Sequence, residues 1–338
     1  MTAPTTYTYT NTYKVGRGRL AFNQLNSDSE YEGFRWLGNC PGFEINVESE
    51  NLQHTSSEGG LAEVDLDTPL SITRTATIQI DNFSADNLAI FLGASVADLA
   101  QASATVTNEL IEWVRTERFY QLGTSVLTTG SRSITGVTVD VYAPARANST
   151  AYAVGDMYLP ATPNDHVYIC TVAGTSDATP PTFNVAGSTH TDGTATFKDA
   201  GLTSTLTSGT DYLLDGTHGI VSIGTTGQIA DIYDSCVAAV GSAVGAFNLR
   251  LHVDYTRPAN SREQIATGAA GAVEGQLKFV ADNPIGANQD VFIPSCTLRP
   301  NGAMPFITAG EVAAVELAVG ISVLNTTTSA IYIDGRPA

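Results

Sequence analysis

Hydrophobic and polar residues alternate over short segments along most of the chain, and this period of two is typical of half-buried antiparallel strands. The clearest case is 43–50, where Phe43, Ile45 and Val47 fall on one face and the residues between them are polar. Comparable segments, bounded by turn residues, occupy 18–22, 34–39, 71–80, 111–123, 131–144, 210–215, 219–223, 246–256, 275–284, 319–324 and 330–335. The sequence therefore predicts a mainly β fold.

One segment has the three-to-four spacing of an amphipathic helix instead. Ser84 stands where an N-cap is expected and Gly93 where a helix often ends in a left-handed residue, so a helix is predicted over 85–92. A helix this short is not stable alone and needs a sheet to pack on. The residues expected in that contact are Phe83, Leu88, Ile90 and Phe91.

A polar stretch without a clear period follows the segment 43–50 and runs to about residue 71. It contains the pair Gly59-Gly60, several acidic residues and Pro69. Structureless loops of roughly 20 residues are uncommon in compact domains and usually have a function. The sequence therefore predicts a long functional loop here. The first twelve residues, rich in Thr and Tyr, are expected to form a mobile arm.

The composition changes over 146–200, which is rich in Pro, Thr and Gly and has its own aromatic residues. We interpret this stretch as a small inserted β module. The remainder, 1–145 together with 201–338, is then one discontinuous β domain. The predicted fold class is an antiparallel β-sandwich or barrel with one short flanking helix and this inserted module.

The chain has 16 Lys and Arg against 34 Asp and Glu, a formal net charge of −18. Binding to nucleic acid phosphates requires clustered basic residues, so this charge argues against it. No apolar run is long enough for a membrane helix, and the first residues lack the apolar core of a secretory signal. The four cysteines, Cys40, Cys170, Cys236 and Cys296, are widely separated and are expected to be reduced, small hydrophobic residues of a protein made in a cytoplasm.

No arrangement of residues indicates catalysis. The histidines show no metal-binding spacing, and no nucleophile elbow is present. The pair Asp65 and Asp67 could suit acid–base chemistry or calcium, although a solvated strand face is the simpler interpretation. We expect no enzyme activity, no cofactor and no metal.

Two blocks of the sequence resemble the tail tube (major tail) proteins of bacteriophages with long, non-contractile tails. The first block, 16–60, contains Leu-Gly-Asn-x-Pro-x-Phe at 37–43 and the stretch around His54. The second block, 253–307, contains Gly-x-Leu-x-Phe followed by Asn-Pro-x-Gly at 275–286. The resemblance covers roughly 14–140 and 201–338.

This resemblance implies a structural protein of the virion. Six copies would form a ring, rings would stack, and one sheet of each subunit would join its neighbours into a barrel around a DNA channel. DNA would pass without specific binding, because carboxylates and hydroxyls in the lumen repel phosphate. The implied partners are other copies of the chain and the tail terminator, tape measure and distal tail proteins, with no membrane; the chain would be made in the host cytoplasm and reside in the phage tail.

In this family a long loop and a terminal arm connect adjacent rings. By analogy we assign the loop to 50–70 and the arm to 1–12. The candidate residues for contacts between rings are His54, Ser56, Ser57, Glu58, Gly59, Glu63, Asp65 and Asp67.

The segment 146–200 resembles a small carbohydrate-binding module of the chitin-binding kind. This resemblance implies an alternative function, a glycan-binding surface adhesin. The residues that could contact a glycan are Tyr152, Tyr158, Tyr168 and Phe197. Both tryptophans of the chain, Trp36 and Trp113, lie outside the module, however, so a miniature core is the simpler interpretation of its tyrosines.

Overall fold

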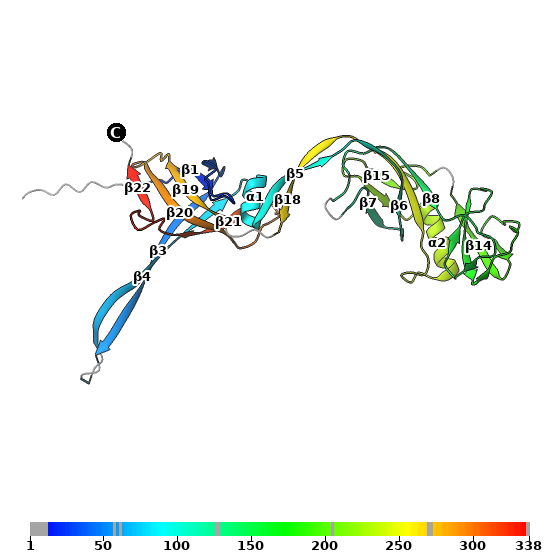
Figure 1. The fold of residues 1–338 in the computed structure, drawn as a ribbon, viewed down its shortest axis with the longest axis horizontal. Helices are drawn as coiled ribbons and strands as arrows, with labels where there is room; N and C mark the ends of the chain where they lie inside the picture. Colours follow the sequence, from blue (N-terminus) through cyan, green and yellow to red (C-terminus); the bar gives the residue numbers. More distant parts are fainter. Residues whose placement is uncertain are drawn as a thin grey trace, which may run out of the picture. The chain divides into compact units, whose positions relative to one another are not determined.

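The computed structural model describes residues 13–56, 59–60, 63–125, 129–203, 206–268 and 273–335. Antiparallel strands predominate, which confirms the predicted mainly β fold. The chain forms two compact units (Figure 1). Unit 1 comprises Met1–Asp98 and Glu263–Ala338, and unit 2 comprises Leu99–Arg262. No helix among the described residues is both long and apolar enough to span a membrane.

The division between the units differs from the expected boundaries at 146 and 200. It falls within β5 (Ala94–Gln101) and β18 (Asn260–Thr267), which pair with each other as a two-stranded sheet. The chain therefore leaves and re-enters unit 1 through two adjacent strands. The segment 146–200 lies within unit 2. The change in composition therefore marks only a part of unit 2 and not its boundaries.

Unit 1 is built on one sheet of eight strands. Seven of them follow the order β2-β1-β19-β20-β21-β4-β3, and β22 pairs with β20. Their bounds are β1 Gly18–Gln24, β2 Arg35–Trp36, β3 Gly42–Ser56, β4 Glu63–Ile80, β19 Val273–Ala281, β20 Gln289–Asn301, β21 Val315–Ile321 and β22 Tyr332–Gly335. One face is apolar and forms the core of the unit, with fully buried Leu20, Ile78, Ile293 and Leu317 among its members.

The helix α1 spans Ala85–Leu92 and matches the predicted bounds. The Ser84 hydroxyl accepts a hydrogen bond from the Asn87 N–H, and Gly93 ends the helix in the left-handed conformation. The helix packs on β20 and β21. Ile90 and Phe91 are buried in the core of unit 1, Phe83 packs on the core from the preceding turn, and Leu88 is half-buried.

The predicted long loop is wrong: β3 and β4 pair from Gly42 to Ser56 and form a long hairpin. Figure 1 shows its outer part projecting from the sheet of unit 1. Two bulges, at Glu50/Asn51 and His54/Thr55, shift the register and interrupt the period of two, so the sequence shows no alternation. Pro69 is tolerated because this part of β4 pairs with β3 alone.

Unit 2 contains two three-stranded sheets and a helix. The sheets are β6 (Ala104–Ile111), β17 (Arg250–Arg257), β8 (Thr135–Tyr142), and β15 (Leu213–Asp215), β16 (Ile220–Ile223), β7 (Arg118–Gln121). The helix α2 spans Gln228–Val240 and was not predicted. Its buried residues Ile229, Ile232 and Cys236 have helical spacing, and this signal could have identified it.

Six further strands of unit 2 lie in the segment 146–200, the last of them ending at Leu202. They are β9 (Ala151–Tyr152), β10 (Met157–Tyr158), β11 (His166–Val172), β12 (Gly174–Thr175), β13 (Thr189–Asp192) and β14 (Ala195–Leu202). Its small aromatic core is joined to the main core of unit 2, because Val167 and Ile169 on β11 pack into the latter.

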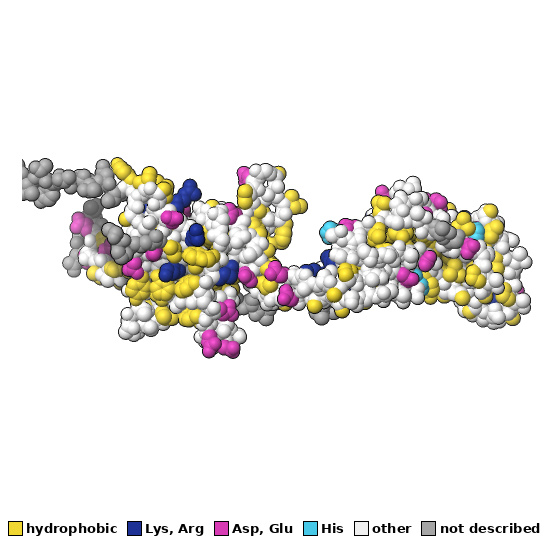
Figure 2. Space-filling model, turned by 90° about the horizontal axis from the view of Figure 1, so that it is seen from above, with side chains coloured by type: hydrophobic (Ala, Val, Ile, Leu, Met, Phe, Trp, Pro, Cys, Tyr) yellow, Lys and Arg dark blue, Asp and Glu magenta, His cyan; other side chains and the backbone are white. Residues whose placement is uncertain are grey.

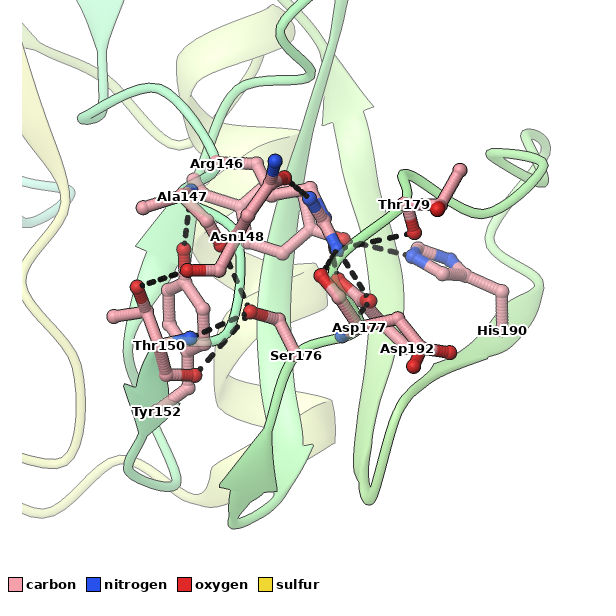
Figure 3. Close-up of polar contacts among 11 residues, drawn as sticks. Arg146, Ala147, Asn148, Thr150, Tyr152, Ser176, Asp177, Thr179, His190 and Asp192 are labelled. Carbon is pink, nitrogen blue, oxygen red and sulfur yellow. Dashed lines mark hydrogen bonds and ion pairs between the residues drawn. The ribbon is translucent and has the colours of Figure 1, made fainter.

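A buried ion pair joins the first residue of this segment, Arg146, to Asp192 on β13 (Figure 3). Nε and Nη2 of Arg146 each donate to one carboxylate oxygen of Asp192 at 2.7 Å, and both side chains are fully buried. Nη2 also donates to the Asp177 carbonyl oxygen at 2.7 Å. Hydrogen bonds from Arg146 and the Asp177 N–H outweigh the opposing effect of burial and lower the pKa of Asp192.

Candidate functional site

The outer part of the β3–β4 hairpin extends beyond the core of unit 1. We call its residues 47–56 and 63–73 the hairpin arm. Almost every side chain in these segments is exposed, because the arm pairs only with itself. A two-stranded ribbon is marginally stable in water and usually needs something to pack against. The arm is therefore a candidate contact surface.

The side chains of the hairpin arm combine two chemical types. Six large aliphatic residues are each about half exposed: Val47, Leu52, Val64, Leu66, Leu70 and Ile72. Five carboxylates accompany them: Glu48, Glu50, Glu63, Asp65 and Asp67. Neither segment contains Lys or Arg. An acidic and apolar strip of this kind is suited to a partner with apolar contacts and basic groups.

The residues proposed for contacts between rings fall on or near this arm. His54, Ser56, Glu63, Asp65 and Asp67 belong to its strands, and Gly59 lies exposed in the turn. Nδ1 of His54 lies 2.5 Å from Oδ1 of Asp65, and both side chains are exposed. Ser57, Glu58 and the segment 1–12 lie outside the described residues.

The sheet of unit 1 is rolled over its apolar face. Strands β3 and β19 are separated in the sheet by β4, β21 and β20, yet the rings of Phe43 and Phe279 lie 5.6 Å apart. The β3 end and the β1–β19 end therefore face each other across the core. Lys14 and Arg17 beside β1 line one cavity with Glu44 on β3 at this seam.

One outer face is acidic. The register aligns alternate residues of β21, β4 and β3 on the side opposite the core. We call this set the acidic face: Glu316, Ala318, Gly320, Thr73, Thr75, Thr77, Gln79, Glu44, Asn46 and Glu48. It holds carboxylates, hydroxyls and amides but no Lys or Arg. Arg299 on β20, opposite Ala318, lies at its border.

The β1–β19 end of the sheet carries a cluster of basic residues, although Glu274 is exposed further along β19. We define the basic face as the exposed residues Lys14, Arg17, Arg19 and Lys278 at the β1–β19 end of the sheet. The Arg19 guanidinium also lies 5.9 Å from the ring centre of Trp36, which is half exposed. Figure 2 shows Lys and Arg side chains gathered on the visible face of unit 1. The local sequence pattern does not predict this cluster, because it depends on the pairing of β1 with β19.

The sheet of unit 1 is also open. In the strand order of the described residues, β3 is an end strand, and its 15 residues pair only with β4. At the other end β2 has only two residues. An unpaired edge is a template for a strand from another chain.

The four aromatic residues proposed for glycan contact do not form an exposed platform. Tyr158, Tyr168 and Phe197 are fully buried, and Tyr152 packs on them half-buried. The rings of Tyr158 and Phe197 lie 4.4 Å apart. A sugar cannot stack on rings that are already covered, so these residues form a miniature core. The expectation of a glycan contact at these residues is wrong.

The four cysteines are free thiols with little reactivity. Cys170, Cys236 and Cys296 are buried, and Cys40 is half-buried. Burial raises the pKa of Cys236 and Cys296 to about 12 and that of Cys170 to about 11. Because the thiolate is the reactive form, these residues act as small hydrophobic side chains.

Comparison with known proteins identifies one family. A family model described as "Protein of unknown function UCP028589" matches residues 13–186. The matched range is more than half of the chain and extends from β1 in unit 1 to the 146–200 segment in unit 2. No curated protein matches the chain. The chain belongs to the family of proteins of unknown function UCP028589.

Proposed function

We propose that this protein is a structural subunit of a phage tail tube, in which copies of the chain form rings, here taken as hexamers, that stack around a DNA channel. The observation that carries the proposal is the open, rolled sheet of unit 1 with its exposed, acidic and apolar hairpin arm. Both features favour association with further copies of the same chain.

Edge pairing supports ring formation. The free edge of β3 offers backbone N–H and C=O groups along its length, and the neighbouring copy would add its own sheet edge. This contact joins two different edges of neighbouring copies, head to tail. When the rotation from one copy to the next is a whole fraction of a full turn, repetition of the contact closes a ring.

Surface charge supports a DNA channel. The acidic face would line the lumen, where carboxylates repel phosphates within a Debye length of about 8–10 Å. Hydroxyl and amide groups on the same face form no ion pair with DNA. DNA could then slide without being bound.

Charge complementarity supports ring stacking. The hairpin arm carries carboxylates and aliphatic side chains, and the basic face carries Arg and Lys beside the half-exposed ring of Trp36. We assign the arm of one ring to the basic face of a copy in the next ring. Tail terminator, tape measure and distal tail proteins would be the partners at the ends of the tube and inside it, and the location would be the virion.

Electron microscopy and sedimentation velocity of the purified full chain test the proposal. Rings or tubes of repeated subunits are expected, with assembly aided by the tail terminator protein where it is needed. Reversing two charges on the basic face, Arg17→Glu with Arg19→Glu, should block stacking and leave single rings. Reversal of Glu63 and Asp67 on the arm to Lys in the same chain should restore it. A chain that remains monomeric under all these conditions contradicts the proposal.

A further inference from the structure

A groove of about 400 Å³ lies in unit 2. One wall is the turn of the 146–200 segment around Val154 and Asp156, and the other is the chain at 245–250. Trp113 and Tyr142 contribute aromatic side chains, and Asn248 and Arg250 contribute polar ones. The groove does not overlap with the acidic face, the basic face or the hairpin arm.

Trp113 is held in a fixed position at this groove. The residue is 50% exposed, and its backbone has a φ of 58°, which is rare for a bulky residue. The Trp113 N–H donates to Oδ1 of Asn248 at 2.7 Å, and this bond secures the strained conformation. A half-exposed aromatic residue at the wall of a groove offers an apolar contact surface to a ligand.

The walls of the groove are fixed by direct backbone packing. Gly155 has a φ of 93°, and a Cβ at this position would collide with the carbonyl oxygen of Ala246. Only glycine allows the two walls to approach this closely. The ring of Tyr142 stacks on His252 with centroids 3.9 Å apart. The groove is therefore preorganised, which lowers the entropic cost of binding.

The polar groups at the groove include a carboxylate and a guanidinium, which are planar and carry opposite charges. Asp156 is exposed, and its Oδ2 accepts the Ala153 N–H at 2.7 Å, which orients the carboxylate. Nε of Arg250 lies 3.3 Å from Oε1 of Glu112, so a carboxylate balances this guanidinium. A ligand with many hydroxyl groups and no charge suits such a set, because hydroxyls pair with carboxylate and guanidinium alike.

We propose that this groove binds a neutral oligosaccharide of flat, equatorially substituted pyranose rings. The C–H face of one ring would lie on the indole of Trp113, and its hydroxyls would bond to Asp156 and Arg250. An aromatic platform beside planar hydrogen-bonding groups offers both surfaces that such a ring presents. The proposal does not depend on tube assembly.

Tryptophan fluorescence of the full chain tests the proposal, because the chain has only two tryptophans. In the Trp36→Phe variant, Trp113 is the sole indole. Titration with chitohexaose and with cellohexaose should change its emission saturably with at least one of the two. The Trp113→Phe variant retains only Trp36 and should show no saturable change.

Calorimetry with the same two oligosaccharides separates binding from optical effects. Trp113→Ala should weaken the affinity about tenfold or more, since it removes the stacking surface. Trp36→Ala is the matched control, because Trp36 is 51% exposed and lies in unit 1. Arg250→Met provides a second variant: it removes a guanidinium that is 31% exposed and paired with Glu112, and it should weaken binding as well.

Three results would overturn the proposal. The first is the absence of saturable change in Trp113 emission with both oligosaccharides. The second is an unchanged affinity in the folded Arg250→Met and Trp113→Ala proteins. The third is saturable binding of a proline-rich peptide to the groove in the absence of any sugar binding.

Discussion

Phe43 on β3 and Phe279 on β19 lie with ring centroids 5.6 Å apart and an interplanar angle of 35°, although three strands separate them in the sheet. Their contact closes the apolar interior of unit 1. The acidic face lies on β21, β4 and β3 and the basic face on and beside β1 and β19, so one polypeptide presents both charges on different strands. The proposed tube needs both: one face toward DNA and the other toward the arm of another copy.

Substitution of Phe91 by Asp should prevent unit 1 from folding. Phe91 is 5% exposed and packs in the core beneath α1. The change removes a large apolar contact and places a carboxylate in an apolar site, at a cost of about 3–5 kcal/mol or more. Thermal unfolding followed by circular dichroism is the measurement. Leu92→Asp, on the same helix at a residue 38% exposed, is the control and should fold. A stable Phe91→Asp protein would mean that α1 does not depend on this contact.

Ile72→Asp should impair assembly and leave the monomer folded. Ile72 is 52% exposed on the hairpin arm, and burial of such a side chain at an interface contributes about 2 kcal/mol. Sedimentation velocity should show smaller assemblies than the unmodified chain forms. Val172→Asp is the matched control at 53% exposure on β11 of unit 2, and it should assemble normally. If the two variants assemble equally well, the hairpin arm does not contribute to the interface between copies.

Asp192→Asn should destabilise unit 2 strongly. The Arg146 guanidinium would lose its buried counter-charge, and an unpaired buried charge costs about 3–5 kcal/mol. Urea unfolding at neutral pH measures the loss. In Glu112→Gln the same type of change affects the partly exposed pair with Arg250, and the expected loss is about 1 kcal/mol or less. Similar losses in the two variants would contradict the special role of the buried pair.

Mild acid should destabilise unit 2 through His190. This side chain is 7% exposed, its Nε2 contacts the Tyr158 hydroxyl at 2.8 Å, and its Nδ1 is buried without a hydrogen bond. Burial lowers the pKa of His190 below its ordinary value of 6.5. The charges of Asp192 and Asp199 raise this pKa and that of Arg146 lowers it, but the effect of burial is the largest. The unfolded chain then binds more protons, so stability falls as the pH drops below about 6.5.

Urea unfolding between pH 7.5 and pH 5 checks this expectation, a range of about one unit or more on either side of the ordinary histidine value. His190→Gln retains a partner for the Tyr158 hydroxyl and cannot titrate, so it should remove most of the slope in this range. An identical slope in the variant would assign the pH dependence to other groups. The lowered pKa of Asp192 acts at lower pH, because its contribution is lost only as the pH falls below 3.8.

The local pattern predicted α1 to the residue and many of the strands. Ser84, the apolar stripe and Gly93 lie within one short segment, and each acts on its immediate neighbours. The alternation at Phe43, Ile45 and Val47 likewise needs only one buried face. Helix α2 was missed although Ile229, Ile232 and Cys236 carry a helical period, because glycines rather than polar side chains flank it at both ends.

The hairpin arm, the roll of the sheet and the fate of the aromatic residues were decided by tertiary structure. Pairing between β3 and β4 passes through two bulges, which break the period that a sequence reader follows. Whether Tyr158 stacks on a sugar or on Phe197 depends on what covers it, and a sequence does not contain that information locally. The sequence by itself therefore determined the β class, the one capped helix and the net charge of −18, while long-range pairing and burial decided which charges share a face. The physical reason is range: capping and periodicity act within a few residues, whereas register and burial join segments that lie far apart in the chain.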